Sequence, residues 1–268
     1  MRPIAALAVL AAALALAGCT STVTRSEGKE SDVKAAPAPP DAEQIKRAAG
    51  VRLELASLYF SRGQFSTALD EIKLALQADP NNAAAHSLSG LIYAAMGNMG
   101  QADASFQRAL QLNPGDADTM NNYGWVLCQN QRYTEAVQMF ERALAQPNYR
   151  GTARTLRVMG ICQLRAGRLD EAEASLVRSY QLDPSSAETA VAVAEVLYRR
   201  GDYERARFYI DRINRSPEQS NAQTLWLGSR IEYKLGNQTL AYGLGDQLRR
   251  RYPKSPEALA FEQGRFNE

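Results

Sequence analysis

The chain has 268 residues, of which 45% are hydrophobic and 22% charged, so it has enough apolar side chains to build a folded core. Its 31 basic and 29 acidic residues leave a net charge of +2, which excludes the strongly basic composition typical of nucleic-acid-binding proteins. The sequence has no Cys/His metal spacing, no glycine-rich phosphate loop and no serine-hydrolase motif, so it predicts no enzyme, cofactor, metal site or small-molecule substrate.

At the amino terminus, Arg2 precedes an apolar run from Ile4 to Leu16, which is too short to span a bilayer and is typical of a secretory signal. The run ends in Leu16-Ala17-Gly18-Cys19 and resembles the lipobox of bacterial lipoproteins, in which the cysteine is acylated. We therefore expect residues 1–18 to be a lipoprotein signal peptide and Cys19 to carry a covalent lipid. Thr20 after the cysteine resembles the sorting signal for the outer membrane. The alternative is an ordinary signal cut elsewhere, with Cys19 incidental.

Residues 19–44 are predicted to form a lipidated, flexible tether. Their composition is polar, and Ala35–Pro40 is rich in alanine and proline, so this stretch cannot bury a core. It would let the folded part stand on the order of 30 Å from the membrane. A partner-binding role for the tether is the alternative to a plain spacer.

From residue 45 onward the chain repeats a helical hairpin. We call each hairpin a unit and number the units in chain order; unit two shows the pattern most fully. A small residue of the second helix recurs at intervals of 34, 34, 36, 34 and 35 residues, at Ala68, Ala102, Ala136, Ala172, Ala206 and Ala241. A period near 34 with this pattern is the tetratricopeptide signature. We predict an all-α fold, a right-handed superhelical tetratricopeptide solenoid of about six helix-turn-helix repeats followed by a carboxyl-terminal capping helix.

The solenoid is expected to occupy residues 45–268, beginning with a short lead-in helix turn at Ile45–Ala48. The predicted repeats are about 49–82, 83–116, 117–152, 153–186, 187–221 and 222–255, and the predicted cap is 256–268, with its helix running through Phe266.

Helix boundaries are marked by turn residues. Asp79–Asn82, Asn113–Asp116 and Asp183–Ser186 each predict the end of one helix and the cap of the next. Glycines fall at the turn inside five hairpins, where a left-handed backbone is often needed. Gln131 replaces the glycine in unit three, so we expect a slightly different turn there.

Cys128 and Cys162 lie on the first helices of consecutive units. Neighbouring first helices run parallel in a solenoid, so residues at nearly equal heights can approach within disulfide range. Because disulfides persist outside the cytoplasm, we favour a bridge. The alternative is two buried thiols. The only histidine, His86, occupies a position that usually packs, and we expect it to be structural.

Tetratricopeptide proteins resemble one another in binding partners on the concave face of their first helices. The corresponding positions in units one to three predict a partner groove with apolar anchors, at Leu53, Phe60, Leu91, Asn121 and Trp125. In units four to six the corresponding positions are basic and aromatic. The alternative is that these side chains pack on their own neighbours or on the next repeat.

Five stretches carry a more specific resemblance: Asn121–Cys128, Gln138–Leu144, Pro147–Tyr149, Gly160–Cys162 and Ala241–Pro253. They are similar to the type IV pilus biogenesis and stability lipoproteins of the PilW/PilF family. The resemblance implies a lipid-anchored protein on the periplasmic face of the outer membrane, acting as a pilotin that helps secretin subunits assemble. We also expect the protein to be a monomer. Two other functions stay open: an adaptor that scaffolds periplasmic peptidoglycan enzymes, and an enzyme with an unrecognised site.

Overall fold

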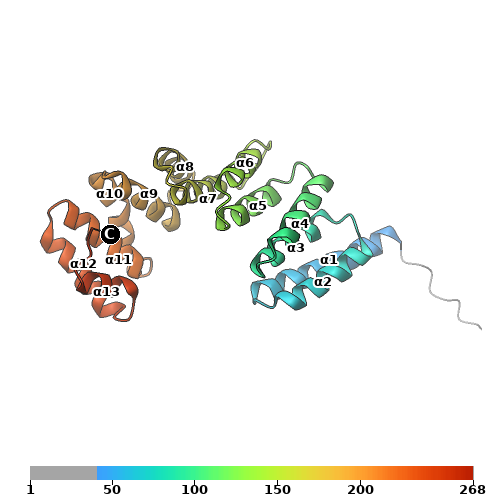
Figure 1. The fold of residues 1–268 in the computed structure, drawn as a ribbon, viewed down its shortest axis with the longest axis horizontal. Coiled ribbons are helices and arrows are strands. Elements are labelled where there is room, and N and C mark those ends of the chain that lie inside the picture. The colour runs from blue at the N-terminus through green and yellow to red at the C-terminus, as the bar shows by residue number, and fades with distance from the viewer. Residues whose placement is uncertain (1–40, 268) are drawn as a thin grey trace, which may run out of the picture. The chain divides into compact units, whose positions relative to one another are not determined.

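The computed structural model describes residues 41–267, which form 13 α-helices and no strand (Figure 1). The predicted signal peptide, Cys19 and most of the predicted tether lie outside the described residues. The helices are α1 (Ala42–Ser61), α2 (Phe65–Ala78), α3 (Ala83–Ala95), α4 (Met99–Leu112), α5 (Ala117–Gln129), α6 (Tyr133–Leu144), α7 (Thr152–Arg165), α8 (Leu169–Leu182), α9 (Ala187–Arg200), α10 (Tyr203–Asn214), α11 (Ala222–Lys234), α12 (Gln238–Arg251) and α13 (Pro256–Glu262).

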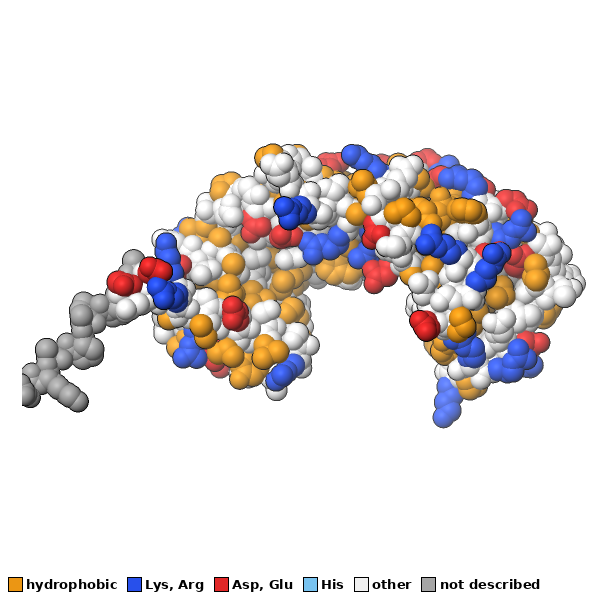
Figure 2. All heavy atoms as spheres, turned by 180° about the vertical axis from the view of Figure 1, so that it is seen from behind, with side chains coloured by type: hydrophobic (Ala, Val, Ile, Leu, Met, Phe, Trp, Pro, Cys, Tyr) orange, Lys and Arg blue, Asp and Glu red, His pale blue; other side chains and the backbone are white. Residues whose placement is uncertain are grey.

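Helices α1 to α12 form six successive antiparallel pairs, and each first helix also contacts the first helix of the next pair. This arrangement confirms the predicted all-α tetratricopeptide class. We call the side lined by α1, α3, α5, α7, α9 and α11 the first-helix face. Basic and acidic side chains are interspersed over the surface seen in Figure 2. Within residues 41–267, no helix combines the length and the apolar character needed to cross a bilayer.

The predicted boundary residues cap the helices. Asn82, Asp116 and Ser186 each accept a hydrogen bond from the backbone N–H three residues later, which satisfies a donor that the first helical turn leaves unpaired. Asp41 caps α1 in the same way, so α1 begins at Ala42 and runs without a break. The predicted helical turn at Ile45–Ala48 is therefore part of α1, and the helix begins before the predicted tether boundary at residue 44.

The turns inside the hairpins share one backbone geometry. The five glycines adopt φ values between 73° and 80°, as at Gly167 and Gly201. Gln131 adopts φ 62°, and the N–H of Arg132 donates to the carbonyl of Leu127 just as Asp202 donates to Leu197 after Gly201. The expectation of a different turn at Gln131 was wrong: the side chain accepts the left-handed conformation, which the surrounding hairpin imposes.

In the second, third and fourth pairs, a glycine on the first helix faces a bulky residue on the second. A Cβ added at Gly124 would lie 2.8 Å from the ring of Phe140, and one added at Gly160 would lie 2.6 Å from Leu176. Phe140 and Leu176 are fully buried. The small residues therefore set how closely the two helices of a pair approach, and the bulky ones fill the core between successive pairs.

The carboxyl terminus departs from the predicted single helix. Helix α13 ends at Glu262, the chain turns at Gly264 with φ 66°, and Phe266 folds back into the core with 3% of its surface exposed. Its ring stacks on Tyr233 at 4.3 Å between centroids and lies 5.3 Å from Trp226. The cap is thus a short helix plus a folded-back tail, which together cover the last repeat.

Candidate functional site

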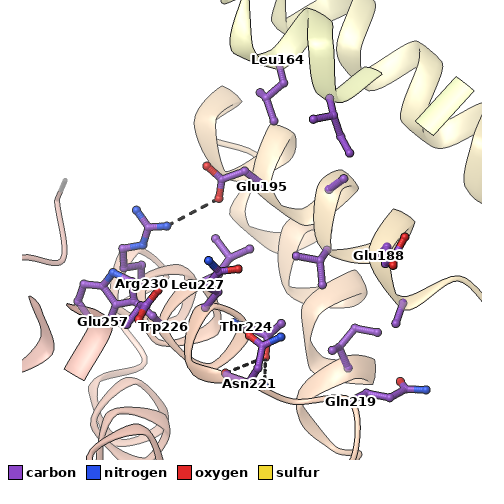
Figure 3. A pocket seen from close by; sticks show the side chains of 16 residues that line it. Leu164, Glu188, Glu195, Gln219, Asn221, Thr224, Trp226, Leu227, Arg230 and Glu257 are labelled. Atoms are coloured by element: carbon purple, nitrogen blue, oxygen red, sulfur yellow. Dashed lines mark hydrogen bonds and ion pairs between the residues drawn. The ribbon is translucent and has the colours of Figure 1, made fainter. Parts of the chain in front are cut away.

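A hollow of about 630 Å³ lies on the first-helix face between α7, α9 and α11 (Figure 3). We call it the α7–α9–α11 hollow. Helix α13 and the connection between α10 and α11 complete its edge. Its lining residues are Ile161, Leu164, Ala187, Glu188, Val191, Ala192, Glu195, Ile213, Gln219, Asn221, Gln223, Thr224, Trp226, Leu227, Arg230 and Glu257.

The floor of the hollow is hydrocarbon. Leu164, Ala192 and Leu227 are buried, and Ile161 and Val191 are half-buried beside them. On each helix lining residues recur at intervals of three or four, as Glu188, Val191 and Glu195 do on α9, which places them on one side of that helix. A floor of this kind favours apolar side chains from a ligand, since burying them removes hydrocarbon from water.

One wall is fixed by a stacked arginine. The Arg230 guanidinium lies 4.6 Å from the ring centroid of Tyr198 and 5.7 Å from that of Trp226, both within cation–π range. Its Nη2 is 3.7 Å from Oε2 of Glu195, and the other carboxylate oxygen, Oε1, accepts a hydrogen bond from Arg199 at 2.7 Å. Burial raises the pKa of Tyr198, while the nearby Arg230 opposes that rise. These contacts hold the Arg230 guanidinium in the wall of the hollow.

The edge of the hollow is acidic and rich in amides. Glu188 forms an ion pair with Arg157 at 2.8 Å, and 72% of the Glu188 side chain is exposed. Glu257 makes no ion pair with any residue that the structure describes. Gln219 and Gln223 are exposed at the same edge. The edge therefore offers carboxylates and carboxamides around an apolar floor.

The predicted groove residues of units one to three are only partly accessible. Leu53 and Phe60 are half-buried against the core of the first two pairs, and Leu91 and Trp125 against the core that follows. Asn121 is 5% exposed, and its Oδ1 accepts a hydrogen bond from Thr155 at 2.8 Å. Asn121 therefore joins α5 to α7 and is not available to a partner in this structure.

The predicted basic strip of units four to six is largely engaged by its neighbours. Arg154 pairs with Asp118 at 2.5 Å, and Arg165 lies 5.3 Å above the ring of Trp125. Trp226 is 8% exposed beneath the carboxyl-terminal cap. Sequence reasoning missed the floor of the hollow; the signal that could have found it is the apolar residues spaced by three and four from the predicted groove positions of α7, α9 and α11.

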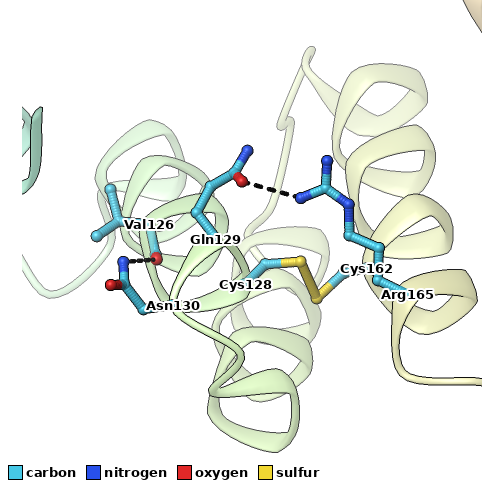
Figure 4. Close-up of a disulfide and its surroundings, with 6 residues drawn as sticks. All are labelled: Val126, Cys128, Gln129, Asn130, Cys162 and Arg165. Atoms are coloured by element: carbon cyan, nitrogen blue, oxygen red, sulfur yellow. Dashed lines mark hydrogen bonds between the residues drawn. A yellow bond between two sulfur atoms is a disulfide. The ribbon is translucent and has the colours of Figure 1, made fainter. Parts of the chain in front are cut away.

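Cys128 on α5 and Cys162 on α7 are joined by a disulfide, with their Cα atoms 5.8 Å apart (Figure 4). Both residues are buried. Next to the bridge, Arg165 donates to the side-chain oxygen of Gln129 at 3.0 Å, so the same two helices are also joined at their surface. Oxidation of this pair in the cell stays a prediction.

The remaining histidine, acidic and basic side chains considered as candidate site residues make contacts within the fold. His86 has its Nε2 3.0 Å from the carbonyl oxygen of Pro80, across the turn before α3. No group of three or more histidine, cysteine, aspartate or glutamate side chains suited to a metal occurs among residues 41–267. Arg132 bridges Asp103 and Glu135, at 2.6 and 2.7 Å, which links α4 to α6.

Family models of the tetratricopeptide repeat match most of the helical region. One, described as "Tetratricopeptide repeat", matches residues 81–146 and 117–185, a second with the same description matches 163–225, and a third, "TPR repeat", matches 56–97. The paired helices, these matches and the apolar hollow on the first-helix face define a tetratricopeptide-repeat protein.

Similarity to two proteins, PilF and PilW, identifies the family within the tetratricopeptide-repeat class. The chain is 29% identical over 210 residues to "Type IV pilus assembly protein PilF" of Pseudomonas aeruginosa, covering 78% of this chain and 83% of that protein. A solved structure of Pseudomonas aeruginosa PilF matches with a TM-score of 0.72, covering 82% of this chain and 99% of that one, at 28% identity. The crystal structure of "PilW, widely conserved type IV pilus biogenesis factor" matches with a TM-score of 0.74 at 31% identity, covering 80% and 97%. The chain belongs to this PilF/PilW family of tetratricopeptide proteins.

Proposed function

We propose that this chain is an outer-membrane lipoprotein that assists type IV pilus assembly as a pilotin for the pilus secretin. The observation that carries the proposal is the similarity to PilF and PilW, which spans 97% or more of both solved chains. Those relatives are named for pilus assembly and biogenesis. The role is binding of another protein, without a catalytic step.

The anchor in this proposal is a lipid on Cys19 after removal of residues 1–18. Several acyl chains, at about 0.8 kcal/mol per buried methylene, hold a protein stably on a bilayer where one chain does not. Residues between Cys19 and Asp41 would form the tether, because α1 begins at Ala42. The helical pairs would then lie in the periplasm, next to the outer membrane.

The proposed mechanism depends on confinement. A lipid-anchored protein meets other proteins at the same membrane at a raised effective concentration, without any new contact. The first-helix face would hold a segment of one secretin subunit until neighbouring subunits replace that contact. The binding residues are the half-exposed anchors Leu53, Phe60, Leu91 and Trp125, together with the α7–α9–α11 hollow.

The anchor is tested in cells. Deleting the gene, or changing Cys19 to Ala, is expected to reduce secretin multimers on unheated gels. The wild-type gene supplied in trans is the control. Normal multimers in both mutants would contradict the proposal.

The binding face is tested separately. Changing Leu53, Phe60 and Leu91 to Ser is expected to abolish capture of secretin subunits. Circular dichroism must show unchanged helicity, because these side chains also contact the core. The matched control is Leu58→Ser on α1, where the side chain is 45% exposed. Unchanged capture by the triple variant would refute the assignment of these anchors.

A further inference from the structure

The α7–α9–α11 hollow is large enough for side chains but not for a folded partner. Its volume of about 630 Å³ falls within the range of pockets that hold small ligands or a few side chains. Leu164, Ala192 and Leu227 provide the buried part of the floor. An occupant must therefore insert apolar side chains from a narrow element, which is either a helix or a single extended segment.

The amides at the edge favour an extended segment. Gln219 and Gln223 are exposed, and within the described residues neither side chain has a hydrogen-bond partner. Asn221 uses its Oδ1 to accept from the N–H of Thr224, which leaves its amide hydrogens for another acceptor. A carboxamide can both donate and accept, as the unpaired backbone of an extended chain requires. A helix satisfies its own backbone groups and would gain little from these three residues.

The charges at the edge favour a basic segment. The lining contains three glutamates and one arginine, and that arginine, Arg230, is engaged by Glu195 and the aromatic rings. Glu188 is mostly exposed, and water around its carboxylate weakens its pair with Arg157. Glu257 has no ion pair among the described residues. Glu188 and Glu257 can therefore attract a lysine or arginine that arrives beside the floor.

We propose that the hollow binds an extended segment in which apolar residues alternate with lysine or arginine. In an extended chain alternate side chains point to opposite sides, so the apolar ones enter the floor while the basic ones lie along the acidic edge. The inference deepens the proposed function and rests on it, since the segment is taken to belong to a pilus component.

The test uses Trp226, which lines the hollow. The chain has two tryptophans, so Trp125→Phe leaves Trp226 as the only one. Two blocked pentapeptides, Lys-Leu-Lys-Val-Lys and Glu-Leu-Glu-Val-Glu, are titrated into the full mature chain in detergent, and Trp226 fluorescence is measured together with calorimetry. We expect the lysine peptide to bind at least roughly tenfold more tightly.

Charge reversal at the edge gives the decisive comparison. Glu188→Lys combined with Glu257→Lys is expected to weaken the lysine peptide by roughly tenfold or more and to strengthen the glutamate peptide. The matched control is Glu141→Lys with Glu171→Lys on α6 and α8, which changes the net charge equally away from the hollow and is expected to leave the preference intact. Glu141, Glu171 and Glu188 are exposed and Glu257 is half-buried, so circular dichroism checks that each double variant is folded.

Three results would overturn the inference: equal binding of the two peptides, no effect of the edge reversal, or no binding of either peptide at about 1 mM. The assay contains no secretin, so its failure is distinct from a failure of the proposed function. Normal secretin multimers after gene deletion would contradict the pilus role, whereas peptide preference reports only on the chemistry of the hollow.

Discussion

The two tryptophans of this chain lie in different halves of the helical array, both on the first-helix face but one helical turn apart in the repeat. When the repeats are aligned on Ala136 and Ala241, Trp125 corresponds to Arg230 and Trp226 corresponds to Asn121. Trp125, in the half formed by α1 to α6, is half-buried beneath Arg165. Trp226, in the half formed by α7 to α13, is 8% exposed because Phe261 and Phe266 of the carboxyl-terminal cap lie against it. Position within a repeat sets which face a side chain joins, but its neighbours decide how much of it a partner can reach.

The halves also differ in what their first-helix faces offer. The amino-terminal half presents half-buried apolar side chains such as Phe60 and Leu91, which belong to core clusters as well as to the surface. The carboxyl-terminal half presents a hollow with a hydrocarbon floor and an acidic edge. The disulfide between α5 and α7 joins the two halves at their boundary.

The largest effect is expected from emptying the core of the amino-terminal half. Phe140 is fully buried against Gly124, so Phe140→Ala leaves a cavity and is expected to cost about 3–5 kcal/mol of unfolding free energy. Guanidinium unfolding followed by circular dichroism measures the loss. Gln138→Ala, an exposed position on the same helix, should change stability by less than about 0.5 kcal/mol. A loss below about 1 kcal/mol for Phe140→Ala would contradict the described packing.

Removing the disulfide that joins the two halves is expected to lower the unfolding free energy by slightly less than Phe140→Ala does. The bridge closes a loop of 34 residues in sequence separation, worth roughly 3–4 kcal/mol in the chain-entropy model. Cys128→Ala with Cys162→Ala should lower the unfolding midpoint and separate the transitions of the two halves, since repeat arrays lose cooperativity when a junction weakens. Identical unfolding of the double variant and the unreduced parent would show that the bridge does not form.

Truncating Phe266, the buried residue of the folded-back tail, should lower the stability of the carboxyl-terminal half alone. Phe266→Ala exposes the faces of Tyr233 and Trp226 and is expected to cost about 2 kcal/mol, close to the transfer free energy of one buried phenylalanine. In the Trp125→Phe background, Trp226 emission should shift to longer wavelength as water reaches the ring. Unchanged emission would mean that the tail does not cover Trp226 in solution.

The smallest effect is expected at the turn between α5 and α6. Gln131 holds a left-handed backbone at φ 62°, so Gln131→Gly relieves local strain and should stabilise by about 0.5–1 kcal/mol after the entropy of the unfolded glycine is counted. Thermal melting of the disulfide-intact protein measures the change. Gln138→Gly, inside α6, should destabilise by about 1 kcal/mol. A lower melting temperature for Gln131→Gly would contradict the shared turn geometry.

Most of the fold could be predicted because its determinants are local. Hairpin periodicity, capping residues such as Asp116 and small residues such as Gly124 each act within a few positions of the chain. The errors fell where longer contacts override local preference. Gln131 accepts a turn that the hairpin imposes, and Phe266 leaves the helical path because it gains burial against Tyr233 and Trp226.

The candidate site was less predictable than the fold. A repeat alignment identifies the first-helix face but not where side chains leave a hollow on it. The α7–α9–α11 hollow depends on the small volume of Ala192, on the α10–α11 connection and on Glu257 from beyond the last repeat. The buried hydrogen bond from Thr155 to Asn121 likewise depends on two units at once. Such features follow from side-chain packing between repeats, which no single repeat specifies.

Site-specific photocrosslinking in intact cells tests whether the pilus secretin binds on the first-helix face. A photoreactive residue in place of Val191, in the hollow, is compared with one in place of Arg178, an exposed residue on α8. We expect the secretin subunit to be crosslinked from position 191 and not from position 178. Secretin crosslinked equally from both positions, or from neither, would contradict binding of the pilus secretin on the first-helix face.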